Sequence, residues 1–242
     1  MNKKLEILYE DNHIIVVVKP YNVLSQADNT NDIDMLSIIK MYIKEKYNKP
    51  GNVYLGLVHR LDRPVGGIMV FAKTSKAASR LSEQVRERKL KKRYLAVVNG
   101  IIKNDNDELI NYIVKCKDNS SKITVKGEGQ IAKLKYTVLE RNIKENLTLV
   151  DIDLETGRHH QIRVQMANIG HTLYGDQRYG KQDKKQIALF SYELEFIHPV
   201  NKELMKFEKM PYKEGVWKLF KSVKWNCKVK NKLQFLSFFV MI

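Results

Sequence analysis

Four charged or titratable side chains lie close together near residue 60, between two apolar segments. They are His59, Arg60, Asp62 and Arg63. Pro64 fixes its own φ and biases the residue before it away from helix, and the Gly66-Gly67 pair permits a tight backbone turn. We therefore expect a strand, a constrained loop and a second strand, with one carboxylate between two arginines. Such a group suits catalysis, but an isolated Arg-x-Asp-Arg string is more often an ion-paired surface turn.

A second polar stretch, TGRHHQIR, begins at Thr156. The spacing of Ile162, Met166 and Ile169 predicts a helix that ends at Gly170. On such a helix His159 and Arg163 are i, i+4 neighbours and face the same side. We reject a metal site made of His159, His160 and His171, because adjacent helical side chains point roughly 100° apart and no carboxylate stands at ligand spacing.

Positive charge dominates the chain and concentrates in one segment. The sequence has 43 Lys and Arg against 27 Asp and Glu, a formal net charge of +16. This surplus favours a polyanionic partner, and nucleic acid fits better than a membrane because the sequence has no basic amphipathic helix or lipidation signal. Six basic residues lie between Arg86 and Arg93. We expect phosphate contacts from Arg88, Lys89 and Lys92, with a solvated helix end as the alternative.

The elements that must position these residues follow from periodicity. Alternating or continuous apolar runs predict strands at 5–9, 13–19, 93–98, 109–114, 122–125, 133–140, 147–154, 186–197 and 205–207. The run IIVVV is expected to be buried on both faces. Helical spacing predicts one helix from Asp32 or Asp34 to Tyr47, a second from Thr74 or Ser75, and a last one over 216–223.

The chain is expected to be one domain over residues 1–225, followed by an apolar C-terminal tail at 226–242. This tail is too short to span a bilayer, which takes ~20 residues. Two distant cysteines, Cys116 and Cys227, argue against a disulfide framework or structural zinc and favour a reducing compartment. Without a signal-peptide pattern at the start, we expect a cytoplasmic protein. It is expected to be a monomer.

Three separated segments resemble one family in the same order: HRLDR at His59, KRYLAVVNG at Lys92, and TGRHHQIR with GDQRYG from Thr156 to Gly180. Together with DNHIIVVVKPYNVL they resemble the RluA-type pseudouridine synthases, over about residues 8–199. The resemblance implies an α+β catalytic fold, with a long mixed, mostly antiparallel sheet, flanking helices and a central cleft. It also implies conversion of RNA uridine to pseudouridine without metal or organic cofactor. The S4-type RNA-binding domain of many relatives is not expected before Leu5.

The resemblance assigns roles to individual residues. Asp62 is the catalytic carboxylate, Arg163 pairs with it, and Tyr94 stacks on the target base and helps to move the C5 proton. Arg60 enters the space left by the flipped nucleotide, and Leu189 lines the pocket. The remaining residues that we expect to bind substrate are His59, Arg63, Arg158, His160, Gln161, Arg88, Lys89 and Lys92.

The sequence departs from the family pattern in places. Val65-Gly66-Gly67 stands where many relatives have Thr-Ser-Gly, and Gln165 and Thr172 replace an expected His and Pro. RNA recognition is therefore assigned to the basic face of the catalytic domain or to the polar segment 101–130. The target is ribosomal or transfer RNA. Two alternatives remain open, a non-catalytic RNA-binding or ribosome-assembly factor and a nucleoside-cleaving glycosylase.

Overall fold

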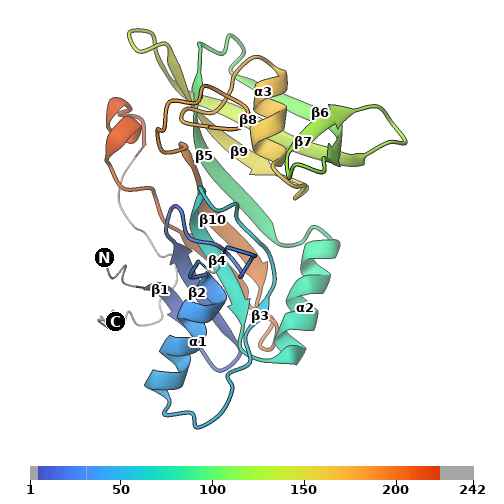
Figure 1. Cartoon of the computed structure of the whole chain (residues 1–242), viewed down its shortest axis with the longest axis vertical. Coiled ribbons are helices and arrows are strands. Elements are labelled where there is room, and N and C mark those ends of the chain that lie inside the picture. The colour runs from blue at the N-terminus through green and yellow to red at the C-terminus, as the bar shows by residue number, and fades with distance from the viewer. Residues whose placement is uncertain (1–4, 31, 224–242) are drawn as a thin grey trace. The chain divides into compact units, whose positions relative to one another are not determined.

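The computed structural model describes residues 5–30 and 32–223, which form two compact units. The first unit contains residues 5–90 and 193–209, and the second contains 91–192 and 210–223 (Figure 1). Strand β10 (Leu189–Ile197) starts in the second unit and ends in the first. The single domain expected over 1–225 stays a prediction, and the whole of the predicted tail at 226–242 lies outside the described residues.

Antiparallel strands form the centre of the first unit. Strand β2 (Ile14–Lys19) pairs with β1 (Glu6–Glu10) on one side and with β4 (Gly66–Ala72) on the other, and the short β3 (Gly56–Leu57) also pairs with β4. Residues 193–197 of β10 pair with β11 (Leu204–Glu208). Every residue of β2 and β4 is buried, which confirms the strand predicted to be covered on both faces.

Two helices of the first unit begin at side-chain caps. Helix α1 (Met35–Lys46) begins after Asp34, whose carboxylate accepts the Ser37 N–H at 3.2 Å. Helix α2 (Ser75–Arg86) begins after Thr74. Its buried Ala77 and Leu81 pack in one apolar cluster with alternate residues of β2 and β4. The helix therefore covers one face of these strands and holds the ends of the loop that joins β3 to β4.

The described part of the second unit is an antiparallel sheet with one α-helix. Its strands follow the order β5 (Lys91–Asn99), β9 (Leu147–Leu154), β8 (Gln130–Asn142), β6 (Asn106–Lys115) and β7 (Ser121–Thr124), and each neighbouring pair is antiparallel. Helix α3 (Gln161–Asn168) packs against β6 and β7. The mixture of strands and helices confirms the predicted α+β class.

The helix predicted over 216–223 is wrong in type and length. The chain forms one 3₁₀ turn, η1 (Gly215–Leu219), and Phe220 is already extended with φ −114° and ψ 140°. Val216, Trp217 and Phe220 are nonetheless buried, so the apolar spacing reflected burial. The N–H groups of Lys221 and Ser222, which would donate along a helix, donate instead to the Glu140 carboxylate at 2.7 and 2.8 Å. Across the described part of the chain, no helix has the length and apolarity to cross a membrane.

Candidate active site

Residues 58–65 form the loop that carries the candidate carboxylate. The loop leaves β3 and returns into β4, which are paired at Leu57 and Phe71. A hydrogen bond of 3.0 Å from the Val65 N–H to the Asp62 carbonyl closes a turn that includes Pro64. The Asp62 side chain is half-buried, whereas Arg60 and Arg63 are exposed. The predicted strand, loop and strand are confirmed, with the carboxylate on the turn itself.

The arginine and histidine of this loop contact other parts of the first unit. Arg63 forms an exposed ion pair with Asp32 at 2.7 Å, a kind of contact that contributes at most about 1 kcal/mol. His59 is buried, and its Nε2 accepts the Val70 N–H at 3.2 Å. A neutral imidazole that accepts at Nε2 carries its proton on Nδ1. His59 therefore ties the loop to β4, and its predicted contact with substrate stays a prediction.

Lys19 is a residue whose importance the sequence did not reveal. Its side chain is fully buried at the end of β2. The ammonium donates to the carbonyls of Pro20 at 3.1 Å, Val23 at 2.5 Å and Arg63 at 3.1 Å. A buried ammonium is stable only when such acceptors replace water. Lys19 thus fixes the backbone directly after Asp62. In the sequence, the only sign of this role is that the lysine ends a strand expected to be buried and stands directly before a proline.

In the second unit, β5 presents the predicted tyrosine and part of the basic cluster. Tyr94 is buried and lies opposite Ile152 of β9. Lys92, two residues before it, points to the same face of the strand. Its Nζ lies 3.2 Å from the point where a Cβ on residue 157 would stand, so the glycine there makes room for the ammonium. Burial lowers the pKa of Lys92.

The structure separates the members of the basic cluster by their partners. Arg93 forms an ion pair with Asp151. Lys89 is exposed and pairs with Glu87 at 2.7 Å. Arg88 is exposed and has a φ of 59° at the end of α2. Leu189, on β10, is buried, and its predicted place in the substrate pocket stays a prediction. The predicted contacts of the cluster with phosphates stay a prediction.

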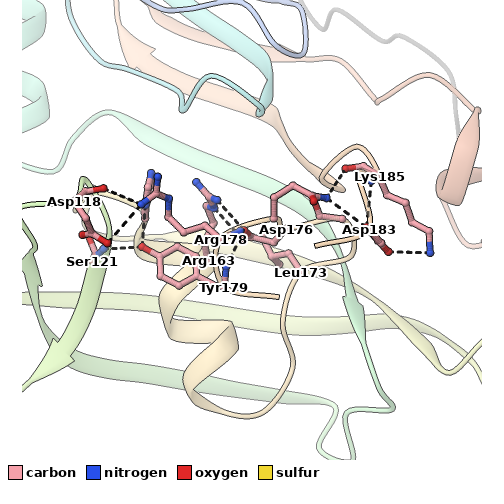
Figure 2. A network of polar contacts seen from close by, with 12 residues as sticks. Asp118, Ser121, Arg163, Leu173, Asp176, Arg178, Tyr179, Asp183 and Lys185 are labelled. Atoms are coloured by element: carbon pink, nitrogen blue, oxygen red, sulfur yellow. Dashed lines mark hydrogen bonds and ion pairs between the residues drawn. The ribbon is translucent and has the colours of Figure 1, made fainter. Parts of the chain in front are cut away.

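Arg163 is held by a carboxylate that the sequence did not single out. Its Nε donates to Asp176 Oδ2 at 2.8 Å and its Nη2 to Asp176 Oδ1 at 2.7 Å, with both side chains buried (Figure 2). Asp176 Oδ1 also accepts the N–H groups of Arg178 at 2.9 Å and Tyr179 at 3.2 Å. The guanidinium carbon lies 5.2 Å from the centre of the Tyr179 ring.

This pairing sets the protonation state of Asp176. Burial by itself raises the pKa of the carboxyl, but the hydrogen bonds and charge of Arg163, with the two backbone N–H groups, outweigh it and lower the pKa. The pair is therefore ionised at neutral pH. The pairing of Arg163 with Asp62 stays a prediction. The segment GDQRYG, which carries part of the family resemblance, forms the loop around Asp176: Gly175 has φ 72°, and a Cβ added there would meet the Gln186 carbonyl at 2.3 Å.

The first residue of α3 and the residues just before it are tied to β8 and to Tyr179. Gln161 is buried, and its Oε1 accepts the Thr156 hydroxyl at 2.7 Å and the Arg158 N–H at 3.0 Å. Arg158 Nε donates to the Ile131 carbonyl at 2.9 Å. His160 Nδ1 lies 2.9 Å from the Tyr179 hydroxyl. These contacts make a rigid base for α3, and the predicted substrate contacts of the three residues stay predictions.

The geometry expected for the two adjacent histidines is wrong. Helix α3 begins at Gln161, so His159 and His160 both precede it, and His160 has a left-handed backbone with φ 53°. The two rings stack at 3.8 Å, so they do not diverge as they would on a helix, and His159 is not a helical neighbour of Arg163. Ser121 Oγ lies 3.0 Å from His159 Nδ1. Within residues 5–30 and 32–223 there is no group of three His, Cys, Asp or Glu side chains that could hold a metal.

Comparison with known proteins gives matches over most of the chain. The sequence profile of the family described as RNA pseudouridylate synthase matches residues 13–168. An uncharacterized RNA pseudouridine synthase of Aquifex aeolicus is 35% identical over 219 residues, which are 86% of this chain and 69% of that protein. The ribosomal large subunit pseudouridine synthase D of Zymomonas mobilis is 32% identical, over 84% of this chain and 68% of its own length. The solved structure of human RNA pseudouridylate synthase domain containing 4 shares the fold, with a TM-score of 0.71, 22% identity and coverage of 86% of this chain and 89% of that chain.

Proposed function

Because the chain belongs to the RNA pseudouridylate synthase family, we propose that it converts selected uridines of large-subunit ribosomal RNA to pseudouridine, with Asp62 as the reactive carboxylate. Membership of the family confirms the resemblance drawn from the motifs and makes the protein an isomerase. The observation that carries the assignment of Asp62 is its place inside the matched segment, on a turn closed by the Val65 N–H. The name of the Zymomonas mobilis relative, ribosomal large subunit pseudouridine synthase D, favours ribosomal over transfer RNA.

The proposed reaction breaks the bond between N1 of uracil and C1′ of ribose and forms a bond between C5 and C1′. The base turns while it stays bound, C5 loses a proton and N1 gains one, so atoms and charge balance. A carboxylate serves the first step by attacking the sugar or by stabilising an oxocarbenium-like centre, as carboxylates do in glycosidases. In the proposal Asp62 supplies this group, Arg163 supports its charged form, and Tyr94 stacks on the base and handles the C5 proton.

The decisive experiment replaces Asp62 with asparagine, which keeps the size of the side chain and removes its charge. We expect pseudouridine formation to be lost while RNA affinity stays within about twofold, because the change removes only an interaction of the transition state. The control is Asp28→Asn, an exposed carboxylate of the first unit that accepts the Thr30 N–H at 2.8 Å. Its activity should equal that of the unmodified protein.

Each other outcome has a defined meaning. Undiminished pseudouridine formation by Asp62→Asn contradicts the proposed mechanism. Free uracil released by the unmodified protein indicates a glycosylase, and RNA binding without any modified product indicates a binding or assembly factor. Mapping of pseudouridines in total RNA with and without the gene tests the substrate class. Sites lost from transfer RNA, with ribosomal sites intact, would overturn the ribosomal assignment and leave the reaction standing.

The basic cluster supplies a separate test of RNA binding. If Arg88, Lys89 and Lys92 each contact one phosphate of a single strand, their replacement by Gln flattens the log–log salt dependence of binding by about 0.7 per contact. Because Lys89 already pairs with Glu87, its replacement should change the slope least of the three. The control is the triple Gln variant of Lys40, Lys44 and Lys49, exposed lysines in or after α1. Equal slopes for the two triple variants would contradict the phosphate contacts and indicate that the cluster is only a solvated helix end.

A further inference from the structure

Ser25 is a buried serine in the loop between β2 and α1 of the first unit. Its hydroxyl donates to the Leu61 carbonyl at 2.7 Å, and the Leu61 N–H donates back to the same oxygen at 3.1 Å. One side chain therefore holds both backbone polar groups of the residue directly before Asp62. The two residues are 36 positions apart in the sequence, so this contact exists only in the folded chain.

Leu61 needs such a partner because of its position between two strands. Strand β3 ends at Leu57 and β4 begins at Gly66, so the backbone of Leu61 lies outside both ladders. The residue is also buried, and buried backbone N–H and C=O groups must find hydrogen-bond partners. A serine hydroxyl is the smallest side-chain group that can donate and accept at the same time. Alanine at position 25 would remove the hydroxyl that bonds both the N–H and the carbonyl of Leu61.

The backbone on the other side of Asp62 is held as well. The Asp62 carbonyl accepts the Val65 N–H at 3.0 Å, and the Arg63 carbonyl accepts the Lys19 ammonium at 3.1 Å. Ser25 and Lys19 thus fix the residues before and after Asp62. These contacts restrain the backbone of Asp62, so the carboxylate moves mainly by rotation about the two side-chain torsions.

We propose that Ser25 is a positioning residue, whose hydroxyl aligns the Asp62 carboxylate with the sugar of the bound uridine. This inference rests on the proposed function, since it takes Asp62 as the reactive group. Attack on the sugar and stabilisation of a cationic centre both depend on distance. A misplacement of about 1 Å costs up to about 10²-fold in rate. Loss of the hydroxyl should therefore slow the chemical step and leave RNA affinity unchanged.

The test compares Ser25→Ala with Thr148→Val, a matched change in the second unit. The Thr148 hydroxyl is also buried and also serves two backbone groups: it accepts the Ile102 N–H at 3.1 Å and donates to the Gly100 carbonyl at 2.8 Å. Both variants should lower the thermal midpoint by similar amounts. Only Ser25→Ala should slow the single-turnover rate at saturating RNA, by about 10- to 100-fold, with the Kd for RNA within about twofold.

A second pair of variants separates the hydroxyl from packing. Ser25→Thr and Ser25→Val have nearly the same shape, and only Thr keeps the hydroxyl. We expect the Thr variant to react at least about tenfold faster than the Val variant, with assays run well below both thermal midpoints. Equal rates for Thr and Val, or a rate loss in Thr148→Val as large as in Ser25→Ala, would overturn the positioning role.

Asp62→Asn, assayed beside these variants, distinguishes failure of this inference from failure of the proposed function. If Asp62→Asn still forms pseudouridine, the assignment of Asp62 fails, and with it the role proposed for Ser25. If Asp62→Asn is inactive and Ser25→Ala reacts at the unmodified rate, only the positioning role of Ser25 fails.

Discussion

Replacement of Asp176 by asparagine tests the buried ion pair that holds Arg163. The pair has two hydrogen bonds, of 2.8 and 2.7 Å, and the Asp176 side chain is fully buried. Removing one partner of a buried pair costs about 3–5 kcal/mol, because the other charge stays buried without compensation. Asparagine keeps one oxygen that can still accept from Arg163 or from a backbone N–H. We therefore expect the free energy of unfolding to fall by about 3 kcal/mol.

Urea unfolding followed by far-UV circular dichroism measures this loss. With a slope of about 2 kcal/mol per molar urea, the midpoint of Asp176→Asn should fall by about 1.5 M at pH 7. The control is Asp118→Asn in the same network, an exposed carboxylate 3.9 Å from Arg178 (Figure 2), whose replacement should leave the urea midpoint almost unchanged. Arg163 held less firmly should also slow pseudouridine formation.

The stability that the Asp176 carboxylate contributes should depend on pH in a defined direction. The folded state lowers the pKa of Asp176, so its contribution is complete above the unfolded pKa of about 3.9 and is lost as pH falls through the lower folded value. The difference in stability between the unmodified protein and Asp176→Asn should therefore shrink below about pH 4. A loss at pH 7 no larger than that of Asp118→Asn, or a difference that grows on acidification, would refute the buried-pair reasoning.

Three further changes test other parts of the structure. Burial opposes ionisation of Glu10, but hydrogen bonds from two lysines and two tyrosines hold its pKa at about 2, so Glu10→Gln should cost about 3 kcal/mol above pH 4.5 and progressively less toward pH 2 in urea titrations. Gly175→Ala should lower the thermal midpoint strongly, since its φ is 72° and a Cβ would meet the Gln186 carbonyl at 2.3 Å, whereas Gly51→Ala, with open space, should not. Thr74→Ala should cost about 1 kcal/mol by removing the cap on the Ala77 N–H, and Thr74→Ser should restore it.

Local patterns in the sequence determined most of the secondary structure and the reactive loop. The run IIVVV, the caps Asp34 and Thr74 and the turn at Asp62 follow from the residue types within each short segment, which periodicity and backbone preference report directly. The ordered motifs likewise identified the family, which the comparisons confirm. The same local reasoning failed at residues 216–223, because apolar spacing reports burial and does not ensure a helix.

Only the tertiary structure decided which partners hold the candidate site residues. Arg163 pairs with Asp176 from the next loop, the Leu61 backbone is held by Ser25, and Lys19 reaches the carbonyl of Arg63. These contacts join residues 13, 36 and 44 positions apart. The types of the residues cannot specify them, since any buried carboxylate or hydroxyl could serve. They arise when strand pairing and helix packing bring distant loops together and place hydrogen-bond partners within reach of the buried polar groups.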